Sequence, residues 1–285
     1  MSASYWKQVQ EADFEVPADR PLDDLTAELT RMLGSNDPVV RDGTAYPALA
    51  TWTSRGVYDE LLAGLGDGMA AGLAVGLGER ESDTVFRRSF SVLVLGECVA
   101  RDNAAGLVPP AKVLEWGDRI STWYLRERDT RGYVPGKGWA HAVAHGADAI
   151  GTLAESPHLG KAELTVLLDV LADRLTLPAD SQFVHGEPDR MAAATMCVLR
   201  RSVVPLTVLE PWVARLAAAA TARTPRGADP FLRRGNSESF LRALYLQLAM
   251  APRPPAVRSD LLLVLVDALR RTNPYYLQLV SNLRP

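Results

Sequence analysis

Histidine and aspartate side chains stand at helical spacing in the middle of the chain. His141, His145 and Asp148 are separated by four and three residues, so a helix wound from about Trp139 would carry all three on one face. Its opposite face would carry Trp139, Val143, Ile150 and Leu153. Between Gly138 and Glu155 the sole charged residue is Asp148. Such a helix lacks an ordinary solvent face, and we therefore expect His141, His145 and Asp148 to form a catalytic or binding site.

The two histidines are compatible with two kinds of chemistry. Imidazoles four residues apart on a helix can bind one metal ion, as in the zinc helix H-E-x-x-H. Ala142 stands where that motif has its catalytic glutamate, so a metal at His141 and His145 would need ligands and a base from elsewhere. Without a metal, the histidines could transfer protons while Asp148 orients His145. Structural histidines bonded to their helix neighbours are the remaining interpretation.

Two loops carry candidate ligand-binding residues. Residues 129–138 include three glycines beside Arg131 and Lys137, and their backbone amides precede the expected helix, where an anion is favoured. A glycine-rich connector that only reverses the chain is the simpler interpretation. Residues 183–190 contain Glu187 and Arg190, which we expect to contact a ligand, and His185, Glu187 and Asp189 are possible further metal ligands.

Two adjacent arginines lie in an unusual place. Arg87 and Arg88 fall in the first turns of an apolar helix expected over 83–101, where cations oppose the helix dipole. Acidic residues of a neighbouring helix, or Asp129, could compensate them. A bound anion is the alternative, which makes Arg87 a candidate ligand-binding residue. Farther along, Asn236 is expected to cap a helix.

The spacing of apolar residues predicts an all-α fold. It follows the helical period almost throughout, without the sustained alternation typical of strands. Helices are expected near 4–14, 21–34, from 38, and over 57–77, 83–101, 110–128, 138–155, 161–175, 189–201, 205–224, 236–250 and 255–272. Short linkers favour antiparallel neighbours, so we predict a HEAT-like α-solenoid, or α/α-superhelix, of about twelve helices. No linker rich in Pro, Gly and Ser divides it, and residues 1–285 are expected to form a single domain.

Composition restricts the partners. The chain has 285 residues, of which 47% are hydrophobic and 23% charged, as in globular proteins. No basic leader precedes an apolar run, and no run approaches the ~20 residues of a membrane span, so we expect a cytoplasmic protein without a membrane partner. From Arg190 onward there are fourteen arginines, no lysine and five acidic residues. These arginines are dispersed, which favours a solvated surface over a nucleic-acid interface.

Several segments stand out together. They are Arg87-Arg-Ser-Phe-Ser91, Glu127-x-Asp-x-x-Gly132, Gly138-Trp-Ala-His-x3-His-x2-Asp148, Glu187-x-Asp-Arg190 and Phe240-Leu-Arg-x-Leu-Tyr245. In this combination the chain resembles an uncharacterised bacterial family catalogued as a domain of unknown function. The resemblance covers roughly residues 20 to 250 and is most specific in the segment 138–148. It implies a HEAT-like helical fold and implies no activity.

Three functions are compatible with these observations. The first is a helical-repeat protein whose concave groove binds a small polar or anionic ligand, through Arg87, Arg131, Trp139, Glu187 and Arg190, and acts on it by acid–base chemistry. The second is a non-enzymatic scaffold for a protein partner, for which the same polar residues are structural. The third is a DNA-base enzyme of the HEAT-like glycosylase kind. The negative net charge of -3 opposes the third.

Overall fold

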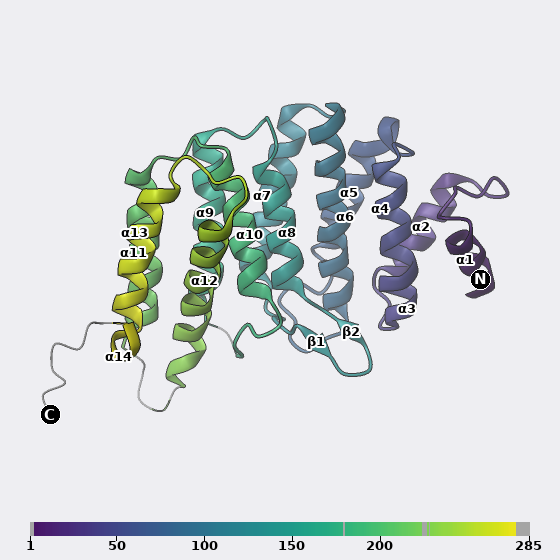
Figure 1. The fold of residues 1–285 in the computed structure, drawn as a ribbon. Helices are drawn as coiled ribbons and strands as arrows, with labels where there is room; N and C mark the ends of the chain where they lie inside the picture. The colour runs from purple at the N-terminus through teal and green to yellow at the C-terminus, as the bar shows by residue number, and fades with distance from the viewer. Residues whose placement is uncertain (1–2, 179, 224–226, 228, 278–285) are drawn as a thin grey trace, which may run out of the picture. The chain divides into compact units, whose positions relative to one another are not determined.

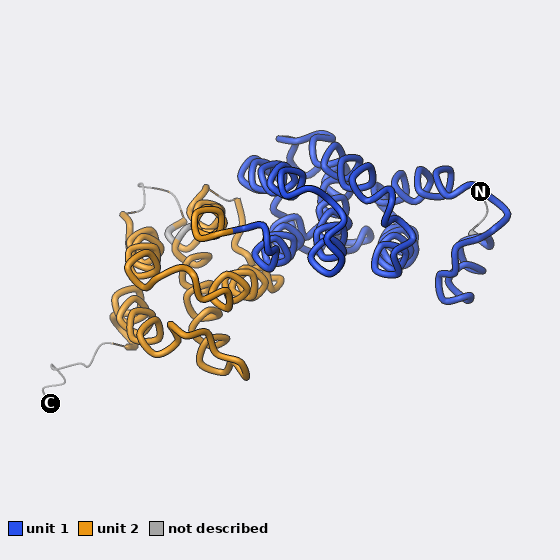
Figure 2. Tube along the Cα trace, turned by 90° about the horizontal axis from the view of Figure 1, so that it is seen from above, with its two compact units in different colours: residues 1–159 blue, residues 160–285 orange. Residues whose placement is uncertain are grey.

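A computed structural model describes residues 3–178, 180–223, 227 and 229–277. It is an all-α fold, as the spacing of apolar residues predicts, and its strands form one two-stranded hairpin in the described part of the chain (Figure 1). Figure 2 shows two compact units, residues 1–159 and residues 160–285. The solenoid and the single domain over residues 1–285 stay predictions. No described helix is long and apolar enough to cross a membrane.

The first unit holds the helices up to α8 and the hairpin. In chain order its elements are α1 (Ala3–Glu11), α2 (Leu22–Met32), α3 (Pro38–Val40), the π-helical turn η1 (Arg41–Ala45), α4 (Tyr46–Ser54), the 3₁₀ turn η2 (Asp59–Leu61), α5 (Leu62–Gly72), α6 (Thr84–Ala105), α7 (Pro110–Arg126), β1 (Tyr133–Val134), β2 (Gly138–Trp139) and α8 (Ala142–Ala154). The α6 and α8 helices run side by side (Figure 1). Close contact between them is possible because Gly96 of α6 faces Ala149 of α8.

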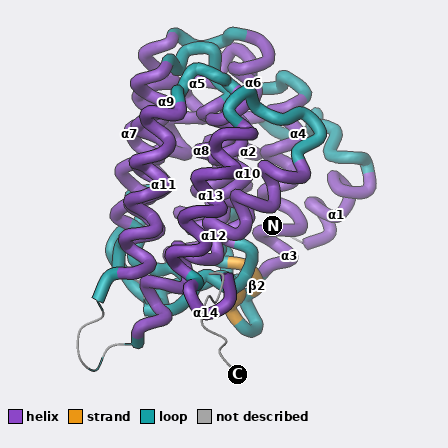
Figure 3. Tube along the Cα trace, turned by 60° about the vertical axis from the view of Figure 1, so that its left-hand side comes forward, coloured by secondary structure: helices purple, strands orange, loops and turns teal. Residues whose placement is uncertain are grey.

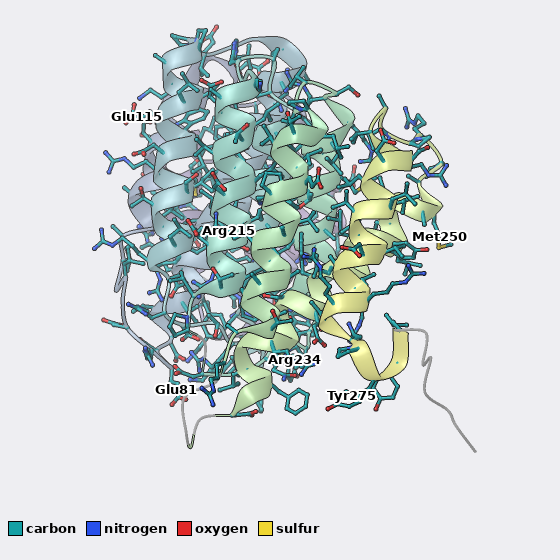
Figure 4. All side chains as sticks on the ribbon, turned by 90° about the vertical axis from the view of Figure 1, so that its left-hand side faces the viewer. Glu81, Glu115, Arg215, Arg234, Met250 and Tyr275 are labelled. Atoms are coloured by element: carbon teal, nitrogen blue, oxygen red, sulfur yellow. The ribbon has the colours of Figure 1, made fainter. Side chains whose placement is uncertain are left out.

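The second unit consists of helices and their loops. Its elements are α9 (Lys161–Thr176), α10 (Glu187–Arg200), α11 (Leu206–Thr221), α12 (Pro230–Met250), α13 (Arg258–Thr272) and α14 (Pro274–Leu277). The α9 and α11 helices are joined by the Trp212 indole, which donates to the Leu168 carbonyl at 2.9 Å. On the surface, Arg215 of α11, labelled in Figure 4, pairs with Asp169 of α9 at 3.0 Å.

Two expected helix boundaries are wrong. The helix expected from Asn236 begins at Pro230, because the Asp229 side chain accepts the Phe231 amide and Pro230 fits the first helical turn. Asn236 therefore does not cap it: it is buried inside α12. The helix expected from about Gly138 begins at Ala142, because residues 138–139 pair with residues 133–134 as a hairpin. Residue 224, the expected end of α11, lies outside the described residues.

A buried ion pair connects three parts of the first unit. The Arg88 side chain of α6 donates to both carboxylate oxygens of Glu127 at 2.5 and 2.9 Å, and neither side chain is more than 1% exposed. Arg88 also donates to the carbonyls of Val75 and Gly76, in the connection after α5. Glu127 ends α7 and accepts hydrogen bonds from the Trp123 indole and from the Arg128 and Asp129 amides. Every strong polar group of the pair is thereby bonded, as burial of charge requires.

We expect Glu127→Ala to lower the free energy of unfolding by about 3–5 kcal/mol, because the variant leaves the Arg88 guanidinium buried without its counter-charge. Urea unfolding followed by circular dichroism measures the loss. As a control, Glu11→Ala removes one member of an exposed pair with Lys7 and should cost less than about 1 kcal/mol. Equal losses in the two variants would contradict the role assigned to the buried pair.

Candidate functional site

The hairpin β1–β2 determines where α8 begins. Tyr133 pairs with Trp139 and Val134 with Gly138, and the orange strands of Figure 3 mark its position among the helices. Gly138 has a φ of 78°, and a β-carbon there would lie 3.0 Å from Cβ of Pro38 and 3.2 Å from a nitrogen of Arg41. Glycine is therefore required at residue 138 both by the backbone conformation and by the neighbouring side chains.

His141 joins the hairpin to α8 in a strained conformation. Its φ of 49° and ψ of 31° are left-handed, which costs a residue with a β-carbon about 1–2 kcal/mol. Hydrogen bonds on both sides impose this conformation. The His141 amide donates to the Arg131 carbonyl at 3.1 Å, and the His141 carbonyl accepts a hydrogen bond from the His145 amide of α8. Strain of this kind in a non-glycine residue is common at functional sites.

The predicted histidine pair is brought together. The His141 and His145 ring centroids lie 5.7 Å apart, edge to face, and both side chains are almost entirely buried. The Trp139 indole stacks on His141 with centroids 4.3 Å apart and planes 21° apart. Trp139 is 41% exposed. It thus lies on the histidine side of the site, and its expected place on the opposite face of a helix is wrong because it belongs to a strand.

His145 has a defined tautomer when it is neutral. Its Nδ1 lies 3.3 Å from the Ser89 carbonyl, and since a carbonyl only accepts, Nδ1 carries the proton and Nε2 is the basic nitrogen. The His145 ring also meets the edge of Phe90, with centroids 5.1 Å apart. Two residues of α6 therefore fix the orientation of this imidazole.

A buried arginine, Arg41, donates a hydrogen bond to the backbone of the hairpin. Arg41 is fully buried with its guanidinium 4.1 Å from the Phe86 ring centroid and 4.9 Å from that of Phe90. It donates to the Lys137 carbonyl at 2.8 Å and pairs with Asp42 at 3.0 Å. Burial raises the pKa of Asp42 despite the neighbouring Arg41. Arg41 therefore links η1, α6 and the hairpin, and the sequence contained no signal that singled it out.

The cations of the loop are neutralised inside the first unit. Arg131 pairs with buried Asp129 at 2.6 Å and donates to the Ser82 carbonyl at 3.0 Å. The Asp129 carboxylate raises the pKa of Arg131. Lys137 binds both oxygens of Asp83 at 2.7 and 2.8 Å. The described contacts of Arg131 and Lys137 therefore position the loop, and the role of Arg131 toward an anion stays a prediction.

The two arginines of α6 have different surroundings. Arg88 is compensated by Glu127, the residue that caps the end of the neighbouring helix α7, in agreement with the expected acidic partner. Arg87 has no ion pair in the described chain, and its buried Nη1 has no hydrogen-bond partner. Its expected role as a ligand-binding residue is compatible with that environment and stays a prediction.

The remaining candidates are Asp148, on the same helix as His145, and residues of the second unit. Asp148 is half-buried one turn beyond His145 on α8. Glu187 and Arg190 belong to the first turn of α10 in the second unit. Glu187 is 1% exposed and accepts the His185 amide at 2.7 Å, so it stabilises the start of its own helix. Asn236 accepts the Phe183 amide at 2.8 Å and attaches the preceding loop to α12.

Metal ligands do not converge in the described part of the chain. No group of three His, Cys, Asp or Glu side chains there is arranged to hold an ion. A structural zinc site uses four protein ligands and a catalytic one typically three. The described donors of the first unit around His141 and His145 therefore do not form such a set, and the further ligands expected from residues 183–190, which belong to the second unit, stay a prediction.

The part of the chain that matches a known family includes most of the candidate site residues. A family model described as "Protein of unknown function (DUF2785)" matches residues 73–246, more than half of the chain. The chain belongs to this family. The DUF2785 match includes the Arg88–Glu127 pair, the hairpin and the histidines, and it begins after α2 and α5. No curated protein and no solved structure matches the chain.

Substitution of His141 by glycine should leave the protein about 1 kcal/mol more stable than substitution by alanine. Both variants lose the imidazole, but glycine adopts the left-handed backbone without the penalty that alanine suffers. Urea unfolding of the two variants measures the difference.

A matched pair of variants at Leu114 of α7, a partly exposed helical residue, serves as the control. There the order should reverse, with Leu114→Gly less stable than Leu114→Ala by about 1 kcal/mol. If alanine were the more stable choice at both positions, the strain assigned to His141 would be absent.

Proposed function

We propose that this DUF2785 protein binds a small polar or anionic ligand at the cluster formed by Trp139, His141 and His145. The observation that carries the proposal is the left-handed His141, whose imidazole is held between the Trp139 indole and the His145 ring. Glycine would adopt the same left-handed conformation without the strain that a β-carbon causes. The presence of an imidazole in this strained conformation supports a role for the ring itself.

The chemistry of the three side chains supports the same ligand class. A partly exposed indole offers a flat apolar surface, and a neutral imidazole supplies both a hydrogen-bond donor and an acceptor. Because the tautomer of His145 is fixed by Ser89, its Nε2 is the basic nitrogen for a proton on a ligand. Acid–base catalysis by His141 and His145, with Asp148 as the orienting group, is the reaction class that this site would support.

A protein-interaction scaffold is the second candidate, and a different surface favours it. Leu246 and Met250 of α12 are 54% and 73% exposed, and they lie four residues apart on one helix face; Figure 4 labels Met250. Leu246 also lines a hollow of about 360 Å³ together with Val184 and Arg242. Apolar side chains in such a position are typical of contacts with another protein.

We expect His145→Ala to reduce ligand binding more than it reduces stability. The Ser89 carbonyl that accepts from His145 lies inside α6, so the loss of this long hydrogen bond should contribute about 1 kcal/mol or less to the change in stability. A panel of small carboxylates and phosphates, tested by thermal unfolding, identifies a ligand that raises the melting temperature of the wild type. That rise should disappear in His145→Ala and in Trp139→Ala.

His158→Ala provides the matched histidine control. His158 belongs to the same unit and lies 3.6 Å from Asp102, away from the hairpin, so its removal should leave the ligand-induced rise intact. A large loss of stability in His145→Ala, with the ligand-induced rise unchanged, would assign this histidine to the core and favour the scaffold.

A further inference from the structure

An apolar groove lies between α2 and α5 in the first unit, outside the residues that the family model matches. Its volume is about 470 Å³, within the range of roughly 300–1,000 Å³ typical of small-molecule sites. The walls are mainly apolar and include Ala27 of α2 and Leu65 and Met69 of α5. Gly64 and Gly68 keep the α5 side open, since a β-carbon at either residue would meet no atom within 4 Å.

Contacts at its two ends give the groove a direction. At its beginning, the Thr26 hydroxyl of α2 lies 2.8 Å from the hydroxyl of Tyr58, which precedes α5. Beyond its other end, Arg87 lies against both Gly34, just after α2, and Gly72, the last residue of α5. The rise of a helix gives about 18 Å between the levels of Leu22 and Gly34.

The charges at the two ends differ in sign. Asp23 and Glu60 line the beginning of the groove. Arg87 lies one turn beyond the last groove residues, Thr30 and Met69, at the opposite end. A β-carbon on Gly72 would be 3.2 Å from Nε of Arg87, and one on Gly34 would be 3.4 Å from its Cβ. The two glycines thus let this long side chain lie between the helix ends.

Arg87 is an exception among the cations of its unit. The other buried or half-buried Lys and Arg side chains that the structure describes there have a carboxylate partner: Arg20–Glu28, Arg41–Asp42, Arg88–Glu127, Arg101–Asp59, Lys112–Asp67, Arg131–Asp129 and Lys137–Asp83. Arg87 has none, and burial lowers its pKa. The Nη1 atom is buried without a hydrogen-bond partner. A desolvated guanidinium without a counter-charge is costly unless an anion is supplied.

We propose that the groove binds an amphipathic carboxylate of the fatty-acid type. Its hydrocarbon chain would lie against Leu65 and Met69, and its carboxylate would pair with Arg87. The apolar walls supply the burial of the chain, and the head group supplies the charge that Arg87 lacks within the protein. This site is separate from the histidine cluster, and it does not depend on the function proposed for that cluster.

Isothermal titration calorimetry of the full chain tests the ligand class with three probes. Dodecanoate, kept below the concentration at which it self-associates, should bind. Dodecyltrimethylammonium has the same chain with the opposite charge and should bind at least ten-fold more weakly. Acetate carries the head group alone and should show no binding at the same concentration. Equal binding of the two amphiphiles, or acetate binding as tightly as dodecanoate, would overturn the proposal.

Four substitutions test the site itself. Arg87→Gln should weaken dodecanoate binding about ten-fold or more, because a charged hydrogen bond is lost, and Arg87→Lys should restore part of it. Gly68→Leu should abolish binding by filling the groove, while the helix keeps its stability because leucine has the higher helix propensity. The charge-matched Arg126→Gln, at an exposed residue of α7, should bind as the wild type does.

The negative end of the α5 dipole offers Arg87 a purely structural partner, and the same variants separate the two roles. A structural arginine predicts that Arg87→Gln lowers the melting temperature and leaves dodecanoate affinity unchanged. Unchanged affinity in Gly68→Leu, with helicity by circular dichroism equal to that of the wild type, would likewise overturn the groove as the site. Should Arg87→Gln fail to fold, Gly68→Leu and the charge-reversed probe still decide the question.

Discussion

The bidentate pair between Arg88 and Glu127 is the interaction on which the first unit depends. A guanidinium and a carboxylate buried together are stable only if every strong donor and acceptor is bonded, and the partners of this pair come from the end of α5, from α6 and from the end of α7. Glu127 also accepts the amides of the next two residues. The pair therefore fixes where α7 ends and where the loop that leads to the histidines begins.

A second set of contacts positions the candidate site against α6. Arg41 stacks on Phe86 and Phe90 and donates to the backbone of the hairpin, while Phe90 meets the ring of His145. His141 has the strained conformation of this connection, and its backbone hydrogen bonds join the Arg131 carbonyl, just before the hairpin, to the His145 amide of α8. A strained residue persists where its surroundings determine its conformation more strongly than its own preference does. The rigid frame around His141 meets that condition.

Among the buried and half-buried cations that the structure describes in the first unit, Arg87 is the exception, because the others have a carboxylate partner. Arg87 and Arg88 are adjacent on α6 and point to different neighbours, because successive residues of a helix lie about 100° apart. Arg88 reaches the end of α7 and its carboxylate. Arg87 reaches two glycines at the ends of α2 and α5, where the protein supplies no acid. Arg88 thus stabilises the core through a buried ion pair, whereas Arg87 is left for the proposed ligand of the groove.

The sequence by itself determined the all-α class, most helix positions and the proximity of His141 and His145. Those are local properties: apolar periodicity and caps act within a few turns of one helix, and only four residues separate His141, just before α8, from His145 in its first turn. Only the tertiary structure decided that Trp139 belongs to a strand, that Asn236 is buried, and that Glu127 neutralises Arg88. Each of these depends on a partner distant in sequence, from Asn236 to Phe183 and from Arg88 to Glu127. A single sequence specifies what a side chain can bind, but only the packing of distant segments decides which partner it meets.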